Sequence, residues 1–391
     1  MRPVGPRDVN GVLLSGACES TAVSRAASVC AAMLCALPVI AAEAPDASDP
    51  VAQPAWHAPL ASRALMLDGA RAGRLIVVVG ERGIALTSHD DGESWQQGEV
   101  PVRSTLTGVH LADERLGWAV GHDSVILRTR DGGATWQLLN YAPEKETPLL
   151  DVWFADAARG FAVGAYGRFL QTSDGGDHWE TRDFVALRWG AITGQPSGVR
   201  ADAAEEADDS DRGEIWEDAE QGPLDYHLNQ IAVAPEGRLY IAAEAGHIFR
   251  SDDGGESWGA LPSPYDGSFF GVLPLGGERL LVVGLRGHVF SSDDGGLTWT
   301  ETPSGTTATL TQGVRLDDGA VLIGGLAGTL LESRDDAATF TLHERADRLG
   351  TSVLLAGDAG HLILIGEGGA RRMTVEDALG ADATGQGARG R

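Results

Sequence analysis

Residues 292–299 read S-D-D-G-G-L-T-W, and the chain repeats this eight-residue box along its length. The shared pattern is Ser or Thr, any residue, Asp, any residue, Gly, any residue, a Ser, Thr or His, and Trp. Further copies stand at 88–95, 129–136, 172–179 and 251–258, with a degenerate copy at 333–340. The final aromatics lie 41, 43, 79, 41 and 41 residues apart. A nearly constant spacing with one long gap indicates a repeat array that carries one insertion.

The chemistry of the box predicts a folding device. The hydroxyl at position 1 and the carboxylate at position 3 can accept backbone N–H hydrogen bonds across a tight turn, and Gly at position 5 supplies a positive φ. The Trp at position 8 begins the next strand, where its ring can cover the turn. Calcium or sugar binding by the carboxylates is the alternative interpretation. The structural residues are then Asp90, Asp131, Asp174, Asp253, Asp294 and Asp335, with Trp95, Trp136, Trp179, Trp258 and Trp299.

A second repeated phrase precedes each box: an apolar run, a Gly, a short turn and another apolar run. It reads V-V-V-G-E-R-G-I-A-L from Val77, and a seventh copy, L-I-L-I-G-E-G-G-A-R from Leu362, has no box after it. Short β-branched and apolar runs bounded by Gly predict strands joined by hairpins. Each unit then has four strands, A to D, and seven units predict an all-β fold, a seven-bladed β-propeller. We expect residues 56–60 to lend the seventh blade its missing outer strand, because this closes the ring.

The first 42 residues have the features of a secretory signal peptide. An almost unbroken apolar run of 17 residues, 26–42, follows Arg25, and an Asp- and Pro-rich stretch comes after it. This pattern predicts a cleaved signal over 1–42, a disordered linker over 43–55 and a periplasmic protein. An uncleaved membrane anchor is the alternative, although the run is short for a membrane span. All three cysteines, Cys18, Cys30 and Cys35, fall in the predicted signal, so we expect a mature chain without disulfides.

The predicted propeller spans 56–375, and a disordered tail is expected over 376–391. An insertion at 185–226 separates the third blade from the fourth. Residues 201–220 of this insertion hold ten acidic residues and one Arg, which predicts a mobile loop because like charges at that density cannot pack. Trp216 lies among these acids and is a candidate contact for a partner, since aromatics are enriched at interfaces. The alternative is that the insertion is a solvated surface loop without a binding role.

Composition excludes several classes of partner. The formal net charge of −26 and the single lysine, Lys145, argue against nucleic acid, whose binding requires clustered basic residues. They also argue against direct binding to anionic membrane surfaces. The chain contains no G-x-S-x-G, H-E-x-x-H or phosphate-binding Gly-Lys motif, so we expect no enzymatic activity and no cofactor. We expect a monomer.

His247 and His288 follow the turn Gly in adjacent units and therefore suggest a metal pair. Equivalent positions in packed sheets lie roughly 10 Å apart. Zinc needs nitrogen ligands at about 2 Å, so this spacing is too large. We attribute the matching positions of the two histidines to the repeated sequence pattern and predict no metal site.

Candidate binding residues gather on the face of the ring that carries the B–C turns and the D–A linkers, which we call the turn face. The boxes lie on the other face. Loops on a rigid scaffold are the usual place for binding residues. Arg82, Arg168 and Arg286, with Tyr166, form a candidate contact patch for carboxylates or for a protein; ordinary solvated turn residues are the alternative. The same face is expected to display Glu81, His122, Asp123, Glu244 and Glu367.

The boxes resemble the Asp-box (BNR) repeats of sialidases and related propellers. The units A-V-G-H-D-S-V-I-L-R-T-R-D-G-G-A-T-W at 119–136 and A-V-G-A-Y-G-R-F-L-Q-T-S-D-G-G-D-H-W at 162–179 are similar to those of the photosystem II assembly/stability factor family (Ycf48-like). The resemblance covers about residues 60–375. It implies a non-enzymatic factor that binds a membrane-protein complex outside the cytoplasm, with the three arginines as contact residues.

The acidic insertion departs from the family pattern, so an envelope transporter is as much an expected client as a photosystem. A glycan-binding propeller or a sialidase-like glycoside hydrolase is the alternative function. The chain lacks the Phe/Tyr-Arg-Ile-Pro segment of sialidases. This alternative predicts a deep pocket at the mouth of the central channel, with paired carboxylates and exposed aromatic side chains.

Overall fold

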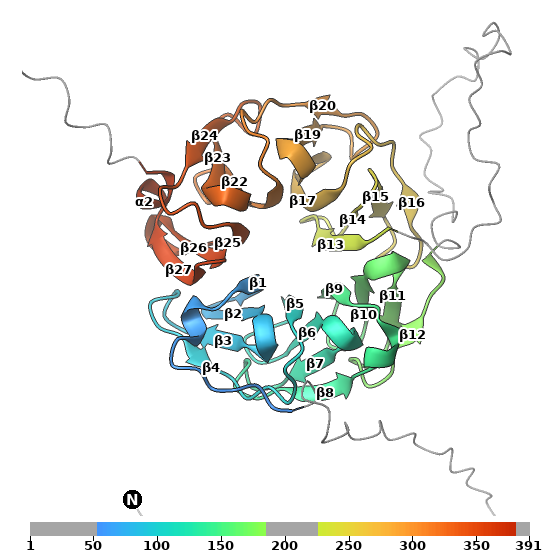
Figure 1. Cartoon of the computed structure of the whole chain (residues 1–391). Helices are drawn as coiled ribbons and strands as arrows, with labels where there is room; N and C mark the ends of the chain where they lie inside the picture. Colours follow the sequence, from blue (N-terminus) through green and yellow to red (C-terminus); the bar gives the residue numbers. More distant parts are fainter. Residues whose placement is uncertain (1–52, 185–225, 381–391) are drawn as a thin grey trace, which may run out of the picture. The chain divides into compact units, whose positions relative to one another are not determined.

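The computed structural model describes residues 53–184 and 226–380, which form seven antiparallel sheets around a central axis (Figure 1). Within these residues six sheets have four strands and the last has three. In each sheet neighbouring strands follow one another in the chain, and the first strand lies innermost (Figure 1). The predicted seven-bladed β-propeller is confirmed.

The sheets, like their strands, are numbered in chain order. The first three sheets consist of β1–β4 (Met66–Ala72, Leu75–Gly80, Ala85–Ser88, Gln96–Gln97), β5–β8 (Leu106–Leu111, Gly117–Gly121, Ile126–Thr129, Gln137–Asn140) and β9–β12 (Leu149–Phe154, Gly160–Gly164, Phe169–Thr172, Glu180–Thr181). The other four consist of β13–β16 (Leu228–Val233, Leu239–Ala243, Ile248–Ser251, Gly259–Ala260), β17–β20 (Phe269–Gly276, Arg279–Gly284, Val289–Ser292, Thr300–Glu301), β21–β24 (Leu310–Arg315, Val321–Gly325, Thr329–Ser333, Thr341–Glu344) and β25–β27 (Thr351–Ala356, His361–Gly366, Gly369–Thr374).

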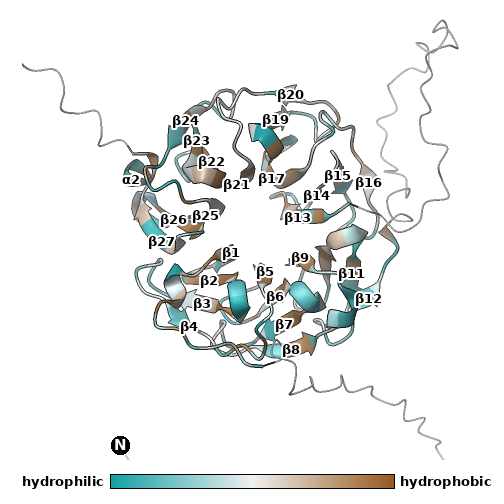
Figure 2. Cartoon of the chain, in the orientation of Figure 1, coloured by the Kyte–Doolittle hydropathy of each residue, from teal (hydrophilic) through white to brown (hydrophobic). Residues whose placement is uncertain are grey.

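The second strand of each sheet is buried on both faces. In β2, Leu75 and Val77 pack against the second sheet, whereas Ile76 and Val78 pack against the seventh. A strand covered on both sides has no polar face, so its sequence is a continuous apolar run rather than an alternating one. In the described residues one apolar cluster fills each boundary between neighbouring sheets, and the apolar strands appear brown in Figure 2.

The chain enters and leaves the predicted insertion at a single apolar cluster. Phe184 precedes it and Tyr226 ends it, and both are buried between the third and fourth sheets beside Phe249. The rings of Phe184 and Phe249 meet edge to face at 4.9 Å between centroids. The third and fourth sheets therefore pack as directly as any other pair. Most of the insertion, with Trp216, lies outside the described residues.

The prediction that residues 56–60 supply the outer strand of the seventh sheet is wrong. Within the described residues that sheet consists of β25, β26 and β27, and 56–60 is not among its strands. The N-terminal segment lies along the first sheet instead: the Ala55 N–H donates to the Val100 carbonyl at 2.9 Å, and the Gln97 amide donates to the Trp56 carbonyl at 2.8 Å. The fourth strand of the first sheet ends at Gln97, and these bonds attach the N-terminal segment to the Gln97 side chain and to the backbone just beyond that strand.

The tail predicted to be disordered from 376 begins with a short helix, α2 (Val375–Leu379). The Thr374 hydroxyl accepts a hydrogen bond from the Asp377 N–H at 3.0 Å, which caps the helix. Ala378 is buried in the cluster between the sixth and seventh sheets. Packing of this apolar face orders the helix, so the prediction is wrong for 376–380. Residues 381–391 lie outside the described residues.

The predicted signal peptide, 1–42, lies wholly outside the described residues, as does 43–52 of the linker. Residues 53–55 belong to the ordered segment along the first sheet. Among the residues that the structure describes, no helix has the length and apolar character needed to span a bilayer.

Candidate functional site

The Asp boxes form hydrogen-bonded turns between the third and fourth strands of the first six sheets. Asp294 Oδ1 accepts from the Ser292 hydroxyl and the Thr298 N–H, both at 2.8 Å, and Asp294 Oδ2 accepts from the Thr298 hydroxyl at 2.6 Å. The Gly296 N–H donates to Ser292 Oγ at 2.8 Å. The same bonds recur around Asp90, Asp131, Asp174, Asp253 and Asp335, with the His178 ring in place of the last hydroxyl at Asp174.

Each box carboxylate thus has both oxygens engaged within its own turn. The hydroxyl and N–H of Ser94 lower the pKa of Asp90 to about 2, and those of Thr339 do the same for Asp335. The turn also presses on the preceding sheet: Gly296 has φ 93°, and a Cβ there would lie 2.5 Å from Leu261. The box is therefore built for folding, because its polar groups satisfy one another and its glycine permits close packing.

Arg82, Tyr166 and Arg286 occupy the same place in three B–C turns. Each is the middle residue of a short 3₁₀ turn, namely η2 (Glu81–Gly83), η5 (Ala165–Gly167) and η6 (Leu285–Gly287). Each adopts the left-handed conformation, with φ of 56°, 55° and 57°, which residues other than Gly rarely do. All three side chains are exposed, that of Arg82 by 77%.

The three predicted arginines do not form a single patch. Arg82, Arg168 and Arg286 belong to the first, third and fifth sheets, so another sheet stands between each pair (Figure 1). Arg168 follows its turn rather than standing at the tip, and its φ is −58°. Its side chain is half-buried, which lowers the pKa of the guanidinium. Only Arg82 and Arg286 share the exposed position at the tip.

The acidic residues of the turn face fix the linkers. Glu81, Glu244 and Glu367 each follow the second strand of a sheet, and each accepts a hydrogen bond from the backbone of the linker that enters that sheet. The distances are 3.2 Å from the Leu65 N–H, 3.0 Å from the His227 N–H and 2.8 Å from the Gly350 N–H. Asp123 accepts from the Ser104 hydroxyl at 2.7 Å in the second sheet. These carboxylates hold linkers to turns, and His122 is exposed beside them.

His247 and His288 belong to aromatic stacks. The His247 ring lies 4.1 Å from the ring of Tyr226, and the His288 ring lies 4.3 Å from that of Tyr265. In both cases the tyrosine comes from the linker and the histidine from the start of the third strand. In the described part of the chain no three His, Cys, Asp or Glu side chains gather in a way that could hold a metal ion.

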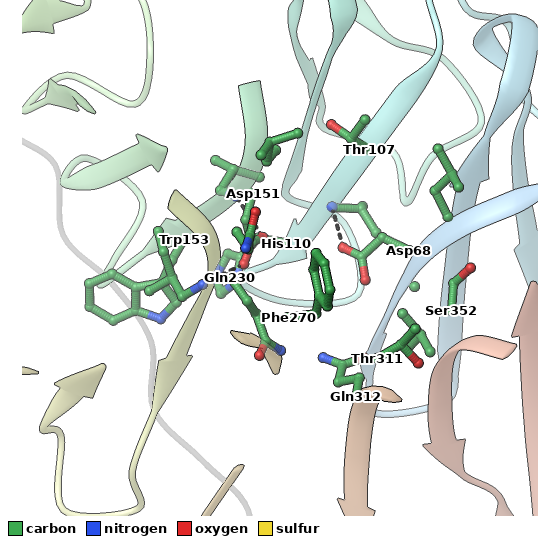
Figure 3. A pocket seen from close by; sticks show the side chains of 18 of the residues that line it. Asp68, Thr107, His110, Asp151, Trp153, Gln230, Phe270, Thr311, Gln312 and Ser352 are labelled. Atoms are coloured by element: carbon green, nitrogen blue, oxygen red, sulfur yellow. Dashed lines mark hydrogen bonds between the residues drawn. The ribbon is translucent and has the colours of Figure 1, made fainter. Parts of the chain in front are cut away.

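A cavity of about 450 Å³ lies at the centre of the ring, among the innermost strands β1, β5, β9, β13, β17, β21 and β25 (Figure 3). Thr309 and Leu326 belong to its lining. Leu326 begins the B–C turn η7 (Leu326–Gly328) of the sixth sheet, so the cavity reaches the turn face. Its lining includes no box residue, no Lys and no Arg.

Polar side chains in the cavity link several inner strands to the next one. The inner strands of different sheets form no backbone ladder with one another. Thr107, Asn229 and Thr311 donate to the carbonyls of Leu149, Phe269 and Thr351 at 2.6, 2.8 and 2.7 Å. At the next position of the inner strands, side chains accept hydrogen bonds from the backbone of the following sheet. The bonds run from the Val109 N–H to Asp68 at 2.8 Å, from the Ile231 N–H to Asp151 at 2.7 Å and from the Val272 N–H to Gln230 at 2.8 Å. These bonds replace the missing ladder.

Asp68 and Asp151 are electrostatically coupled across the cavity. Burial raises the pKa of Asp151 to about 7, against the opposing effect of hydrogen bonds from Ile231 and Val152. Burial, followed by the negative charge of Asp151, raises the pKa of Asp68 well above its usual range. Gly108 lies between them in the second sheet, where a Cβ would stand 3.2 Å from Asp151 Oδ1. The pair therefore retains a proton close to neutral pH.

His110 completes the titratable groups of the cavity. Its ring stacks on Phe154 at 6.4 Å between centroids and meets Trp153 edge to face at 6.5 Å. Burial lowers the pKa of His110 to about 4, so the ring is neutral at physiological pH.

Sequence reasoning missed this cavity. Its polar residues lie in the first strand of each unit, upstream of both repeated phrases. Aligning those strands would have shown either a polar residue or a glycine at one shared position. In chain order the residues are Asp68, Gly108, Asp151, Gln230, Gly271 and Gln312. A polar residue in the middle of an apolar strand is the signal that was available.

Comparisons with known proteins agree with the resemblance. A family model described as photosynthesis system II assembly factor YCF48 matches residues 87–147. The photosystem II assembly protein Ycf48 of Thermosynechococcus vestitus is 25% identical over 234 residues, covering 47% of this chain and 67% of that protein.

Solved structures agree as well. Ycf48 bound to a D1 peptide has a TM-score of 0.59 and 17% identity, covering 80% of this chain and 94% of that one. Ycf48 of Cyanidioschyzon merolae has a TM-score of 0.58 and 14% identity, covering 80% of this chain and 97% of that one. In its repeats and in its architecture the chain is similar to the Ycf48-like β-propellers.

Proposed function

We propose that this chain is a non-enzymatic assembly or stability factor that is exported to the periplasm. There it binds a polypeptide segment of a membrane-protein complex or an envelope transporter through its turn face. A Ycf48 relative has been solved with a D1 peptide bound, which supports peptide recognition by a propeller of this kind. The apolar run at 26–42 supports export.

The exposure of Arg82 and Arg286 carries this proposal. Among the described residues Arg286 forms no ion pair, and the carboxylate closest to Arg82 is that of Glu81 at 3.9 Å. Some arginines of this acidic protein are instead closely paired, as Arg238 is with Glu278 at 2.6 Å. Exposed arginines at the tips of strained turns are suited to carboxylates of another chain, because guanidinium presents a planar fork of donors.

Charge reversal tests the proposal. The double variant Arg82→Glu and Arg286→Glu should abolish co-purification of a membrane protein with the tagged chain and leave the melting temperature unchanged. Arg115→Glu with Arg130→Glu is the matched control, since both side chains are exposed near the A–B and C–D turns of the opposite face. Retained co-purification in the first variant, or equal loss in the control, would contradict the assignment of the turn face.

One observation favours the glycan alternative: the cavity contains the carboxylates Asp68 and Asp151 together with Trp153 and Phe270. The aromatic rings are partly buried rather than exposed, and both oxygens of Asp151 already accept backbone N–H groups. Incubation with sialylated and β-linked oligosaccharides, followed by chromatography, tests this second function. Products released by the wild type but not by Asp68→Asn would support hydrolysis in the cavity. Unchanged oligosaccharides would contradict the glycoside hydrolase alternative.

A further inference from the structure

We infer that the cavity at the centre of the ring binds an alkylammonium group, either a free primary amine or a lysine side chain. The inference rests on the cavity alone and does not depend on the partner proposed for the turn face. A cavity of about 450 Å³ has the size of an ordinary small-molecule site. It combines apolar walls with a few convergent polar groups, which is the usual composition of such sites.

The charged groups of the cavity are all of one sign. Asp68 and Asp151 line it, whereas no Lys or Arg does. The hydroxyls of Thr107 and Thr311 donate to the carbonyls of neighbouring sheets, so only their lone pairs face the cavity. The donors that remain are neutral amide or hydroxyl groups. A cationic donor therefore matches the cavity better than an anion or a neutral acceptor.

An organic cation fits better than a metal ion. No cluster of three or more ligand side chains exists in the described residues, and this cavity offers two carboxylates at most. Its walls include the apolar side chains of Leu67, Val109 and Leu150. An alkyl chain can contact these walls, and the ring of Phe270, drawn beside Asp68 in Figure 3, can attract its charged end.

The carboxylates favour ammonium over guanidinium. Asp151 uses one oxygen for the Val152 N–H at 2.7 Å and the other for the Ile231 N–H at 2.7 Å. Asp68 uses Oδ2 for the Val109 N–H at 2.8 Å, and the Gly69 N–H also bonds this carboxylate. Neither carboxylate has two unengaged oxygens, which the fork of an arginine requires, whereas a single ammonium donor needs only one remaining lone pair.

Binding of the cation is coupled to loss of a proton. The titratable groups facing Asp68 are Asp151 and His110, and His110 is neutral above about pH 4. The raised pKa of both carboxyls keeps a proton on the pair near neutrality. An ammonium group stabilises the ionised form, so its arrival should release that proton.

Calorimetric titration of the full chain with n-butylammonium chloride tests the inference. Repeating it in buffers of different ionisation enthalpy measures proton release. We expect saturable binding with release of a proton near pH 7, and an affinity that rises by about tenfold or more between pH 5.5 and pH 8.5. The neutral analogue n-butanol should bind far more weakly. Equal binding of butanol, an affinity independent of pH, or no binding of butylammonium would overturn the inference.

Two variants locate the site. Asp68→Asn keeps an acceptor for the Val109 N–H and removes the charge, so it should weaken butylammonium binding by about tenfold or more. Asp317→Asn removes one exposed charge from the hairpin between β21 and β22 and should change the affinity less than about twofold. Equal effects would reject the cavity as the site. If Asp68→Asn does not fold, the pH dependence of the wild type decides.

A second titration distinguishes the two sources of the amine. N-acetyl-Gly-Lys-Gly-amide carries the same ammonium group on a peptide. Binding of this peptide at least as tight as that of butylammonium would identify a lysine side chain as the occupant. Binding of butylammonium alone would identify a free amine, because the backbone of the peptide is then too large for the entrance.

Discussion

Asp91 of the first sheet accepts a hydrogen bond from Arg372 of the seventh sheet at 3.0 Å, although 281 residues separate them. Asp91 also accepts from Arg71 at 2.7 Å and from the Asp358 N–H at 3.0 Å. It stands at box position 4, where four other boxes have Gly, and its φ is 60°. The seventh sheet has three strands in the described part of the chain, and this carboxylate and the apolar cluster beneath it hold the first and seventh sheets together.

Asp91→Ala should therefore destabilise the protein by about 2–3 kcal/mol, because it leaves two partly buried arginines without their shared carboxylate. Urea unfolding followed by tryptophan fluorescence measures the change. Asp336→Ala is the matched control: it stands at the same box position in the sixth sheet, but its side chain is 48% exposed. Its loss should cost about 1 kcal/mol or less. Equal losses in the two variants would show that Asp91 has no special part in closure.

Asp294→Ala should destabilise by roughly 1–3 kcal/mol, since the N–H groups of Leu297 and Thr298 lose their acceptor. Differential scanning calorimetry measures the melting temperature. Asp293→Ala is the control, because the neighbouring carboxylate is 78% exposed and bonds only Arg279 among the described residues. An unchanged melting temperature for Asp294→Ala would refute the structural account of the box.

The cavity carboxylates make stability depend on pH in an unusual direction. Asp151 has a folded pKa of about 7, above its ordinary value of 3.8. The stability that it contributes is fully present below the ordinary value and is lost as pH rises through about 7. The pKa of Asp68 is also raised on folding, so Asp68→Asn removes one of the two titrating carboxyls and should reduce this loss. The free energy of unfolding of the wild type and of the variant, measured at pH 5 and pH 8, tests this prediction. A variant that loses as much stability between these pH values as the wild type would contradict it.

The box carboxylates act in the opposite direction. The pKa of Asp90 and of Asp335 is about 2 in the folded protein, below the ordinary 3.8. Their contribution is present above that ordinary value and is lost as pH falls toward 2. Titration of the carboxyl carbons by NMR should therefore place these two groups far below the cavity pair. A value near 4 for Asp90 would mean that its hydrogen bonds with Ser94 do not persist in solution.

Gly108→Ala should cost about 1–3 kcal/mol, because the new Cβ would lie 2.8 Å from the Cα of Asp151 and 2.9 Å from the Leu150 carbonyl oxygen. Gly313→Ala is the comparison within an inner strand, since its closest neighbour is a terminal methyl of Leu273 that can move. Thermal unfolding of both variants measures the difference. A Gly108→Ala variant as stable as Gly313→Ala would show that the second and third sheets are less tightly packed there.

The eight-residue box and the apolar phrase were sufficient to predict the architecture. The hydrogen bonds of the hydroxyl at box position 1 and of the carboxylate at position 3 join residues no more than four apart, as from Ser292 to Gly296, so local spacing encodes the turn. The second strand is a nearly continuous apolar run because a sheet covers each of its faces. These are short-range requirements, and a sequence displays them directly.

Tertiary structure alone decided the rest. Three features depend on where the seven sheets stand around one axis. They are the separation of Arg82 from Arg286, the edge that the N-terminal segment covers, and the contact between Asp91 and Arg372. The Asp68–Asp151 pair arises in the same way, since every inner strand contributes residues to a common cavity. Its charge and its pKa come from distant segments brought together by closure of the ring, a relationship that no local pattern records.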